Sequence, residues 1–457
     1  MADLRPGDSA EVLIERVVPG GEGLARIGGI VTLVRGGLPG DRVRVRVTEA
    51  SPRLVRGDLE EVVAPGEARR ADDEICPRAR DATCGGCDWP AARLENHREL
   101  KTSLVLDAFR RLAGLRPGEL PEPHWRGSAR NYRLRNRLHL DQEGRLGFFA
   151  PRSKDVTNLE VCEIVSRALL GRLPAIRAHL SGLGSLEGEL LTLESREGRT
   201  LLGELRVGEG HGLQISSKVK ERGRGPFDGF RVVDSGGRVL GADGPDSLTI
   251  VAGGSSFEVS VDSFFQGNLY LLDAFLEEIR TALRVRGEDF LRGAKGNGRG
   301  LRAVDLYAGV GFMSRPLLEL AAEAGGAAEV TAVEIEPAAS NSLSKNLQTW
   351  HGEGLPLARA VRASAESFFH SQEFPNSPID VLVADPPRAG LSPAVRAGIL
   401  RLAPRHLLMV SCDPPTLARD LAAMEARYRV ERLTLLDLFP QTHHVETIAL
   451  LVRRKVG

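Results

Sequence analysis

The five cysteines of the chain fall into a group of four and a single residue, and both arrangements can do chemistry. The single cysteine, Cys412, stands at the end of an apolar run, and the other four lie nearer the N-terminus: Cys76, Cys84, Cys87 and Cys162. A thiolate is both a metal ligand and a strong nucleophile. The division therefore predicts a metal or iron–sulfur site in the N-terminal part and a nucleophile in the C-terminal part.

The four N-terminal cysteines have the spacing of a site for an ion or a cluster. Cys84 and Cys87 flank Gly85-Gly86, which lets the backbone turn tightly around one ligand. Four thiolates suit either tetrahedral zinc or a 4Fe–4S cluster, and ligand chemistry alone does not choose between them. The alternative is four unpaired core cysteines, which the neighbouring glycines and charged residues disfavour.

Length and composition set the expected organisation. A chain of 457 residues with 42% hydrophobic residues can bury a large core and is long enough for three domains. We place these domains at residues 1–65, 66–250 and 251–457. No apolar run is long enough to span a bilayer and no secretory signal is evident, so we expect a cytoplasmic protein without disulfides or a membrane partner. Basic and acidic residues number 61 each, so nucleic-acid affinity must come from local patches.

The C-terminal part contains the pattern of a nucleoside-binding site. Residues 302–306 read as a buried strand that runs into a glycine turn at Gly309 and Gly311, and a second strand ends at Glu334. Such a turn admits a ligand close to the backbone, and the acid is placed for a ribose diol. A dinucleotide-binding enzyme is disfavoured, because Ser314 stands where the third glycine of its turn would be.

Two further strands and an acid complete this C-terminal pattern. Residues 379–384 read as a strand that is followed by Asp385, and residues 407–411 read as a strand that is followed by Cys412. Glu446 stands just before the last strand, residues 448–452. Open α/β sheets bind ligands at the carboxyl ends of their strands. Each segment alone could be structural, and a strand-end cysteine is more often a core residue, but their order along the chain indicates a catalytic site.

The N-terminal part carries two candidate phosphate-contacting stripes. Residues 1–65 read as short strands with glycine-rich turns, which is typical of a small β-barrel, and one strand presents Arg42, Arg44 and Arg46 on one face. That face could follow a phosphate backbone, although the strand pattern alone favours a plain solvated surface. A second stripe offers phosphate contact and solvated surface as equal alternatives; its members are Arg133, Arg135, Arg137 and His139.

Four C-terminal segments together resemble the RNA 5-methyluridine methyltransferase family: Asp305-Leu306-Tyr307-Ala308-Gly309-Val310-Gly311, Asp385-Pro386-Pro387-Arg388-Ala389-Gly390, Ser411-Cys412-Asp413-Pro414, and Phe439-Pro440-Gln441-Thr442-His443-His444-Val445-Glu446. The N-terminal strands resemble a TRAM domain, and the four cysteines resemble the iron–sulfur site of the 23S ribosomal RNA branch. The resemblance implies an α/β fold, with a Rossmann-like methyltransferase domain, an N-terminal small β-barrel and a central α+β domain. It also favours the 4Fe–4S cluster over zinc.

The resemblance implies a reaction and assigns residues to it. The cofactor would be S-adenosylmethionine. Cys412 resembles the nucleophile that adds to C6 of uracil, and Glu446 the base that removes the C5 proton. Asp385 resembles a residue close to both cofactor and uracil, and further cofactor contacts are implied at Gln266, Tyr307, Gly309 and Glu334. A uracil inside folded RNA must be flipped out to reach Cys412, which calls for an RNA-binding region in the N-terminal part.

The implied partner is RNA, with 23S ribosomal RNA favoured and the T-loop uridine of transfer RNA as the alternative. We expect no DNA partner and a monomeric protein. A 5-methylcytosine enzyme would carry a cysteine after Asp385-Pro386-Pro387, and an amino-group methylase an aromatic residue, but Arg388 stands there. A non-catalytic RNA-binding protein is a further alternative, which the joint presence of Cys412 and Glu446 disfavours.

Overall fold

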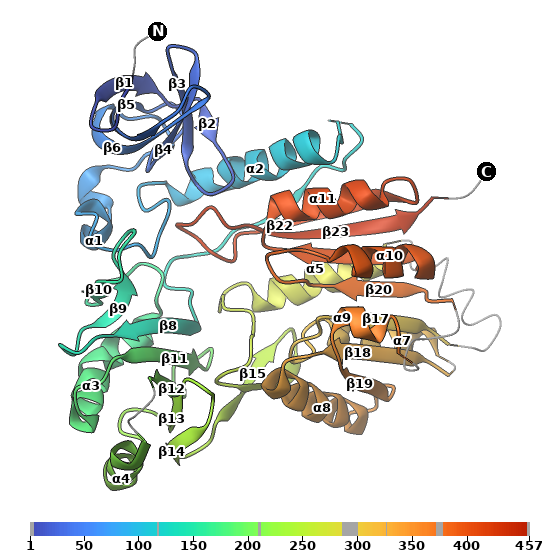
Figure 1. Cartoon of the computed structure of the whole chain (residues 1–457). Helices are drawn as coiled ribbons and strands as arrows, with labels where there is room; N and C mark the ends of the chain where they lie inside the picture. The colour runs from blue at the N-terminus through green and yellow to red at the C-terminus, as the bar shows by residue number, and fades with distance from the viewer. Residues whose placement is uncertain are drawn as a thin grey trace.

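In the computed structural model, which describes residues 4–116, 118–208, 212–285, 300–325, 327–371 and 378–454, the described strands form four sheets (Figure 1). The N-terminal sheet has the order β1-β5-β6-β4-β3-β2 and is rolled into a compact unit. Its strands are β1 (Ser9–Leu13), β2 (Arg16–Val17), β3 (Gly23–Ile27), β4 (Ile30–Arg35), β5 (Arg42–Ala50) and β6 (Leu54–Ala64).

Strand β5 shows the alternation that the sequence predicts. Its valines are buried and its arginines face outward. Each of these arginines lies near a carboxylate: Arg42 with Glu11 at 3.5 Å, Arg44 with Glu61 at 2.6 Å, and Arg46 with Glu60. The face is therefore a ladder of charge pairs and not an unpaired basic stripe, which supports the solvated-surface interpretation of these residues.

The central sheet follows in the order β10-β9-β8-β11-β12-β13-β14. Before it come α1 (Pro77–Arg80) and α2 (His97–Leu112) and the short 3-10 turns η1 (Asp72–Glu74) and η2 (Leu94–Asn96). The strands are β8 (Arg135–Leu140), β9 (Leu146–Phe149), β10 (Val156–Asn158), β11 (Gly188–Glu194), β12 (Leu201–Val207), β13 (Gly229–Asp234) and β14 (Val239–Asp243), and its helices are α3 (Arg167–Leu183) and α4 (Gly212–Arg222).

The second arginine stripe is held by protein contacts at most of its positions. Arg133 lies over the Phe148 ring, Arg135 donates to the carbonyl oxygens of residues 261 and 262, and the His139 ring stacks on Phe149. Arg137 stays largely exposed, 3.8 Å from Glu189. Most of the stripe is therefore structural, and Arg137 is its most accessible cation.

The C-terminal sheet has the order β19-β18-β17-β20-β21-β23-β22-β7, preceded in the chain by the hairpin β15 (Ser247–Ala252) and β16 (Ser255–Ser260). Strands β17 to β21 are parallel, whereas β23 is antiparallel to β21 and β22. Their bounds are β17 (Arg302–Leu306), β18 (Glu329–Glu334), β19 (Ala358–Arg362), β20 (Val381–Ala384), β21 (His406–Ser411), β22 (Tyr428–Leu436) and β23 (Glu446–Arg453).

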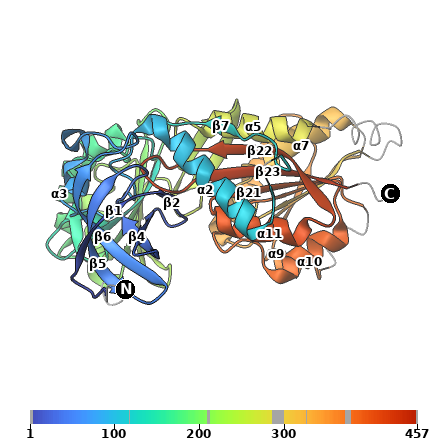
Figure 2. The ribbon, with the colours of Figure 1, turned by 90° about the horizontal axis from the view of Figure 1, so that it is seen from above.

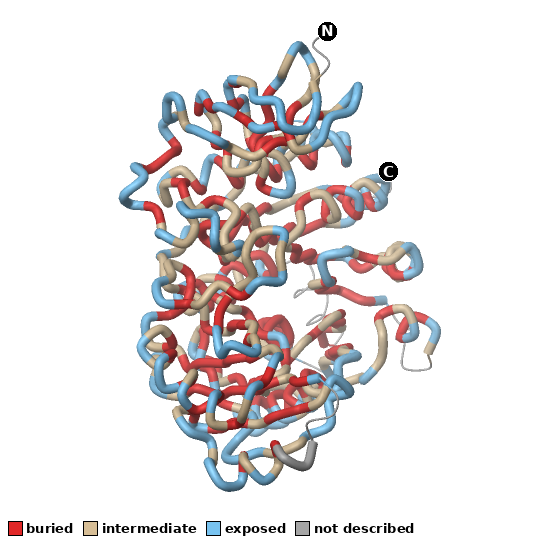
Figure 3. Tube along the Cα trace, turned by 60° about the vertical axis from the view of Figure 1, so that its left-hand side comes forward, coloured by how far each residue is buried: buried red, intermediate tan, exposed pale blue. Residues whose placement is uncertain are grey.

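Helices cover both faces of this sheet, so its central strands β20 and β21 are buried along their whole length and are mostly apolar in sequence. Figure 3 shows that buried residues gather in the interior of the molecule. Val381 and Val383 pack into one core with α5 (Leu272–Arg284), α7 (Ser314–Ala324) and α8 (Pro337–Gly352). The alternate residues, Leu382 and Ala384, pack into the other core with α2, α9 (Ala365–Phe368), α10 (Pro393–Leu402) and α11 (Pro414–Met424). The arrangement is the expected Rossmann-like α/β layer order.

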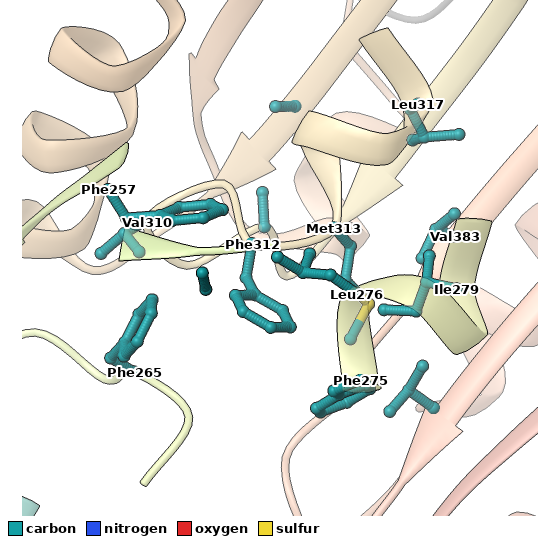
Figure 4. Packing of buried hydrophobic residues seen from close by; sticks show 14 of the residues in the cluster. Phe257, Phe265, Phe275, Leu276, Ile279, Val310, Phe312, Met313, Leu317 and Val383 are labelled. Atoms are coloured by element: carbon teal, nitrogen blue, oxygen red, sulfur yellow. The ribbon is translucent and has the colours of Figure 1, made fainter. Parts of the chain in front are cut away.

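Phe312, the residue after the glycine turn, belongs to the first of these cores. Its ring lies between those of Phe257, Phe265 and Phe275, with centroid distances of 5.3–5.6 Å (Figure 4). Because Phe265 precedes Gln266, this aromatic cluster ties the glycine turn to the segment that carries Gln266.

Two segments from residues 66–250 extend into the C-terminal layers, which the sequence did not predict. Strand β7 (His124–Arg126) pairs in parallel with β22 and is the outermost strand on that side of the sheet. Helix α2 packs on α11 (Figure 2). The C-terminal sheet and the helices that pack on it therefore include segments from both halves of the chain. None of the described helices is long and apolar enough to cross a membrane.

We predict that Arg69→Met lowers the free energy of unfolding by about 3–5 kcal/mol, because it leaves a buried carboxylate unpaired. Asp41 is fully buried and accepts hydrogen bonds from Arg69 at 2.7 and 2.9 Å. Arg44→Met is the matched control: it removes an exposed pair and should cost about 0–1 kcal/mol. Equal losses for both variants in chemical denaturation would contradict this interpretation.

Candidate active site at the sheet edge

Three functional side chains meet where the central strands β20 and β21 of the C-terminal sheet end. We call this end of the sheet the sheet edge, and strand direction explains why the three residues meet there. Asp385 follows β20 and Cys412 follows β21, and these strands are parallel. Strand β23 runs antiparallel to β21, with Ser411 opposite Thr447, so Glu446 at its start lies at the same edge. The structure thus brings together the two strand-end residues and the acid that the sequence predicted as separate elements.

The backbone around Cys412 is fixed on both sides. Strand β21 is fully buried up to Ser411, and Asp413 caps the next helix by accepting a hydrogen bond from the Thr416 amide at 2.9 Å. Pro414 begins α11 with a backbone angle that suits the first turn. Cys412 therefore lies on the short, rigid link between a core strand and a capped helix.

The two carboxyl groups of the edge are buried and close enough to influence each other. Burial raises the pKa of Asp385 to about 7. Burial, and then the negative charge of Asp385, raise the pKa of Glu446 well above its ordinary value. The resting site therefore holds at least one of these groups as a neutral acid near neutral pH, because two adjacent buried carboxylates repel each other.

Cys412 is half-buried, and its sulfur is a thiol in the resting site. Burial, and next the charge of Glu446, raise the pKa of Cys412 to about 12. The charge of the Arg388 guanidinium and its polar interaction with the sulfur act in the opposite direction and lower the pKa of Cys412. An Arg388 nitrogen donates to Nε2 of His444 at 3.0 Å. Arg388 is thus the group that favours the thiolate, a role that the sequence did not reveal.

A pocket of about 540 Å³ opens beside this edge and is lined by Tyr307, Glu334, Glu366, Pro387 and Arg419, among other residues. Glu334 accepts hydrogen bonds from the Gly309 amide at 2.8 Å and the Glu336 amide at 2.7 Å. These bonds fix both carboxylate oxygens and leave each with a free lone pair. The Glu334 carboxylate can therefore receive the two hydroxyls of a ribose.

The loop that follows β17 needs unusual backbone angles. Tyr307 has φ +62°, Gly309 +56° and Gly311 +96°, and a Cβ at Gly311 would approach Leu343 and Trp350 to 3.0–3.1 Å. Below this loop, the buried Asp305 accepts a 2.6 Å hydrogen bond from Ser314. Burial raises the pKa of Asp305 to about 7. Ser314 stands where a dinucleotide turn would have its third glycine. Its hydrogen bond to Asp305 joins the start of α7 to strand β17 across the loop.

The predicted cofactor residues do not all line this pocket. Gln266 is buried in the segment between β16 and α5, next to the aromatic cluster, and is not among the residues around the pocket. Ser364 and Glu366, at the start of α9, do line it but were missed, because a Ser-Ala-Glu segment has no signal of its own. Their place after β19 in a parallel sheet is what brings them there.

The four N-terminal cysteines converge on one small cavity. All four are free and half-exposed and line it together with Phe148 and residues 157–164. Burial, and then the charges of the other cysteines, raise the pKa of Cys87, and burial raises the pKa of Cys162 to about 11. Backbone amides donate to two of the sulfurs, Gly86 to Cys84 at 3.4 Å and residues 164 and 165 to Cys162. Such amides stabilise the thiolate form that a metal or a cluster requires.

The four cysteine sulfurs do not form a tight ligand group in this structure. Among the described residues, the one group of ligand atoms that lie within 4.8 Å of one another is formed by Asp88, His443 and His444. No three of the four cysteine sulfurs are therefore that close together.

The loop between β22 and β23, residues 437–445 (here the 437–445 loop), connects the cysteine region to the active site. His443 donates from Nδ1 to the Asp88 carboxylate at 2.7 Å, and the Trp89 amide donates to the Gln441 carbonyl at 2.9 Å. Asp88 and Trp89 directly follow Cys87. The sequence predicted His443 and His444 only as part of a segment, and their partners from the cysteine loop could not be predicted without the fold.

An open α/β sheet with a glycine turn after β17, an acid at the end of β18 and Cys412 after β21 has the layout of an enzyme that binds a nucleoside cofactor. A family model described as tRNA (Uracil-5-)-methyltransferase matches residues 258–454, and a TRAM domain model matches residues 4–59. The chain belongs to this RNA methyltransferase family and carries a TRAM domain at its N-terminus. The predicted family and fold class are confirmed.

Two relatives in sequence and one solved structure each match this chain over more than nine-tenths of its length. An uncharacterized RNA methyltransferase of Thermosynechococcus vestitus is 30% identical, over 99% of both chains. A Shewanella protein named 23S rRNA (uracil(1939)-C(5))-methyltransferase is 31% identical, over 94% of this chain and 92% of that one. The solved structure of Pyrococcus abyssi tRNA (uracil-54, C5)-methyltransferase with S-adenosyl-L-homocysteine has a TM-score of 0.67 at 20% identity and covers 97% of this chain and 100% of that one.

We predict that Asp385→Asn stabilises the protein increasingly as pH rises. The folded-state pKa of Asp385, about 7, lies above its ordinary value of 3.8, so the folded state binds the proton more tightly. Stability should therefore fall as pH rises through this interval. The variant loses that fall, and its advantage in melting temperature should widen by several degrees between about pH 5 and about pH 8.

Asp273→Asn is the control for this measurement. Hydrogen bonds from Arg196, chiefly, hold the pKa of Asp273 below its ordinary value. Its loss should therefore cost more stability at high pH than at low pH, which is the opposite trend. A pH-independent difference between Asp385→Asn and the unmodified protein would show that Asp385 is not a raised-pKa acid.

Proposed function

We propose that the chain methylates C5 of a uridine in 23S ribosomal RNA, with Cys412 as the nucleophile and Glu446 as the base. One observation carries the proposal: Cys412, Glu446 and Asp385 lie together at one buried sheet edge beside a pocket with an oriented ribose-binding acid. Family membership supports RNA uracil as the substrate class. The substrate RNA and the roles of the individual residues are what the proposal adds.

The chemistry requires a nucleophile because C5 of uracil alone is a poor one. Attack of the Cys412 sulfur on C6 forms an S–C6 bond and makes C5 electron-rich. Bound S-adenosylmethionine would supply the methyl group from its sulfonium to C5 and would leave as neutral S-adenosylhomocysteine. Arg388 favours the thiolate by its charge and its polar interaction with the sulfur. The raised pKa of the resting thiol means that the nucleophile is activated only when substrate changes the site.

Glu446 completes the reaction in this proposal. Removal of the C5 proton by the Glu446 carboxylate lets the C6–S bond break, which restores the uracil double bond and releases Cys412. Burial and the charge of Asp385 raise the pKa of Glu446, so its carboxylate is a stronger base than an exposed one. Before methyl transfer, the cationic sulfonium would offset the negative charge of Asp385 and so favour ionised Glu446; after transfer the cofactor would be neutral, and the raised pKa of Glu446 would favour uptake of the C5 proton.

Ribosomal RNA is favoured over transfer RNA by the relatives. The Shewanella relative at 31% identity is named for 23S rRNA, whereas the transfer RNA enzyme from Pyrococcus abyssi, at 20% identity, supports the fold alone. The test is nucleoside mass spectrometry of unmodified 23S rRNA and of unmodified transfer RNA, each incubated with the protein and S-adenosylmethionine. We expect 5-methyluridine in the ribosomal RNA alone. Methylation of transfer RNA alone would overturn the substrate assignment and leave the mechanism standing.

We further propose that Cys76, Cys84, Cys87 and Cys162 hold a 4Fe–4S cluster. The four cysteines line one small cavity, and their resemblance to the iron–sulfur site of the 23S ribosomal RNA branch favours a cluster over zinc. Backbone amides aimed at two sulfurs add the hydrogen bonds usual at such clusters. Because Asp88 and Trp89 follow Cys87 and contact the 437–445 loop, an ordered cysteine loop would also stabilise the active site.

We predict that Cys412→Ala abolishes methylation and leaves RNA affinity unchanged within about twofold, because the sulfur bonds to the substrate only during the reaction. Glu446→Gln should instead form the Cys412 adduct and release it slowly, so that a covalent protein–RNA complex accumulates on denaturing gels. Substantial methylation by Cys412→Ala would contradict the covalent mechanism.

For the cysteine site, we predict that protein purified without oxygen is brown, absorbs broadly in the visible range and contains about four iron atoms per chain. Cys84→Ser should lose the colour and lower the melting temperature, whereas Cys412→Ala should keep both. A colourless preparation that contains zinc would contradict the cluster.

A further inference from the structure

Lys101 is a fully buried lysine on α2 whose ammonium group faces the 437–445 loop. Its side chain is 0% exposed. It donates to the Asp437 carboxylate, to the Phe439 carbonyl at 3.1 Å and to the His444 carbonyl at 2.6 Å. All three donors of the ammonium are therefore used, and every one contacts the loop that leads to Glu446.

The other end of this contact is also fixed. The second carboxylate oxygen of Asp437 accepts from Nδ1 of His97, one helical turn before Lys101, at 2.9 Å. Asp437 and His97 are buried as well. Removing a cation and an anion from water is costly unless they are paired and fully hydrogen-bonded. Nonpolar residues would fill this space with a smaller loss of solvation free energy. The three hydrogen bonds of Lys101 instead fix the backbone and the Asp437 side chain of the 437–445 loop.

The Lys101 contacts lie close to both reacting groups along the chain. His444 is two residues before Glu446, and its ring accepts a hydrogen bond from Arg388, whose charge acts on the Cys412 sulfur. Asp437 directly follows β22, whose last residue, Leu436, pairs with Glu446. Lys101 therefore holds both ends of the loop at once, from a helix that packs on α11 (Figure 2).

We propose that Lys101 is a positioning residue that sets the placement of Glu446 for removal of the C5 proton. The proposal rests on the proposed function, because it concerns a step of that reaction. Lys101 does not touch the reacting atoms. It fixes the loop backbone, and a misplacement of the base by about 1 Å is enough to slow such a step by about a hundredfold.

The test compares Lys101→Met, which keeps the length of the side chain and removes its charge, with the unmodified protein on the same RNA and S-adenosylmethionine. We expect kcat to fall by about 10- to 100-fold with KM for both substrates within about threefold. The methylated Cys412 adduct should accumulate, because C6–S bond formation precedes the step that Glu446 performs. The denaturation-resistant protein–RNA complex should thus resemble that of Glu446→Gln.

Arg432→Met is the matched control. It removes a partly buried cation in the middle of β22, which pairs with Glu278 at 2.8 Å and makes no hydrogen bond or ion pair with the 437–445 loop in the described structure. This variant should lose some stability but turn over without accumulating adduct. If Lys101→Met fails to fold, Asp437→Asn replaces it, since it removes the charge opposite Lys101 and keeps the side-chain shape. It should show adduct accumulation to a smaller extent.

The outcomes separate this proposal from the proposed function. If the unmodified protein forms no adduct and no methyluridine, the proposed function fails. If it does both, and the Lys101 or Asp437 variant either turns over normally or is slowed equally in adduct formation and release, the positioning role of Lys101 is wrong. Adduct accumulation in that variant but not in Arg432→Met supports it.

Discussion

The active site depends on a reversal of strand direction within one sheet. Seven of the eight described strands of the C-terminal sheet run in one direction, and β23 lies between β21 and β22 in the opposite direction. Its first residue therefore meets the last residues of β20 and β21 at a single edge. Without that reversal, Glu446 would lie at the far edge of the sheet from Cys412. The reversal is also why the 437–445 loop crosses the edge and must be held in place.

This edge collects groups that burial makes costly to charge. Asp385, Glu446 and Cys412 all have raised pKa values, and Arg388 is the nearby cation acting on the sulfur. Such a site is poised for a cationic cofactor and for proton transfer. Stability and reactivity are opposed here. Burial makes the neutral form of each group lower in free energy, whereas the proposed reaction needs the anions.

The N-terminal half takes part in this site and does more than bind RNA. Helix α2, strand β7 and the cysteine loop all contact the C-terminal layers. Of the two arginine stripes, the one on β5 is paired with carboxylates and most of the other is held by internal contacts. RNA recognition by shape and exposed bases would then rely on other surfaces, with Arg137 as an accessible cation.

The sequence predicted the strands that end at Asp385 and Cys412, the glycine turn and the acid Glu334, because apolar runs and glycines are local signals. It also predicted the convergence of four cysteines from their types. It could not predict Lys101, Asp88 or Arg388 as partners of the site, since a buried ion pair between α2 and a distant loop leaves no local pattern. Ser364 and Glu366 were missed for the same reason: sheet order, and not their own sequence, brings them to the pocket.

The most direct test of the covalent mechanism is to locate the bond itself. RNA in which the target uridine carries fluorine at C5 has no C5 proton to remove, so the adduct cannot be released. After incubation with the protein and S-adenosylmethionine, peptide mass spectrometry should find the methylated fluorouridine attached to the peptide containing Cys412. Attachment to any other residue, or turnover of this RNA without an adduct, would contradict the account.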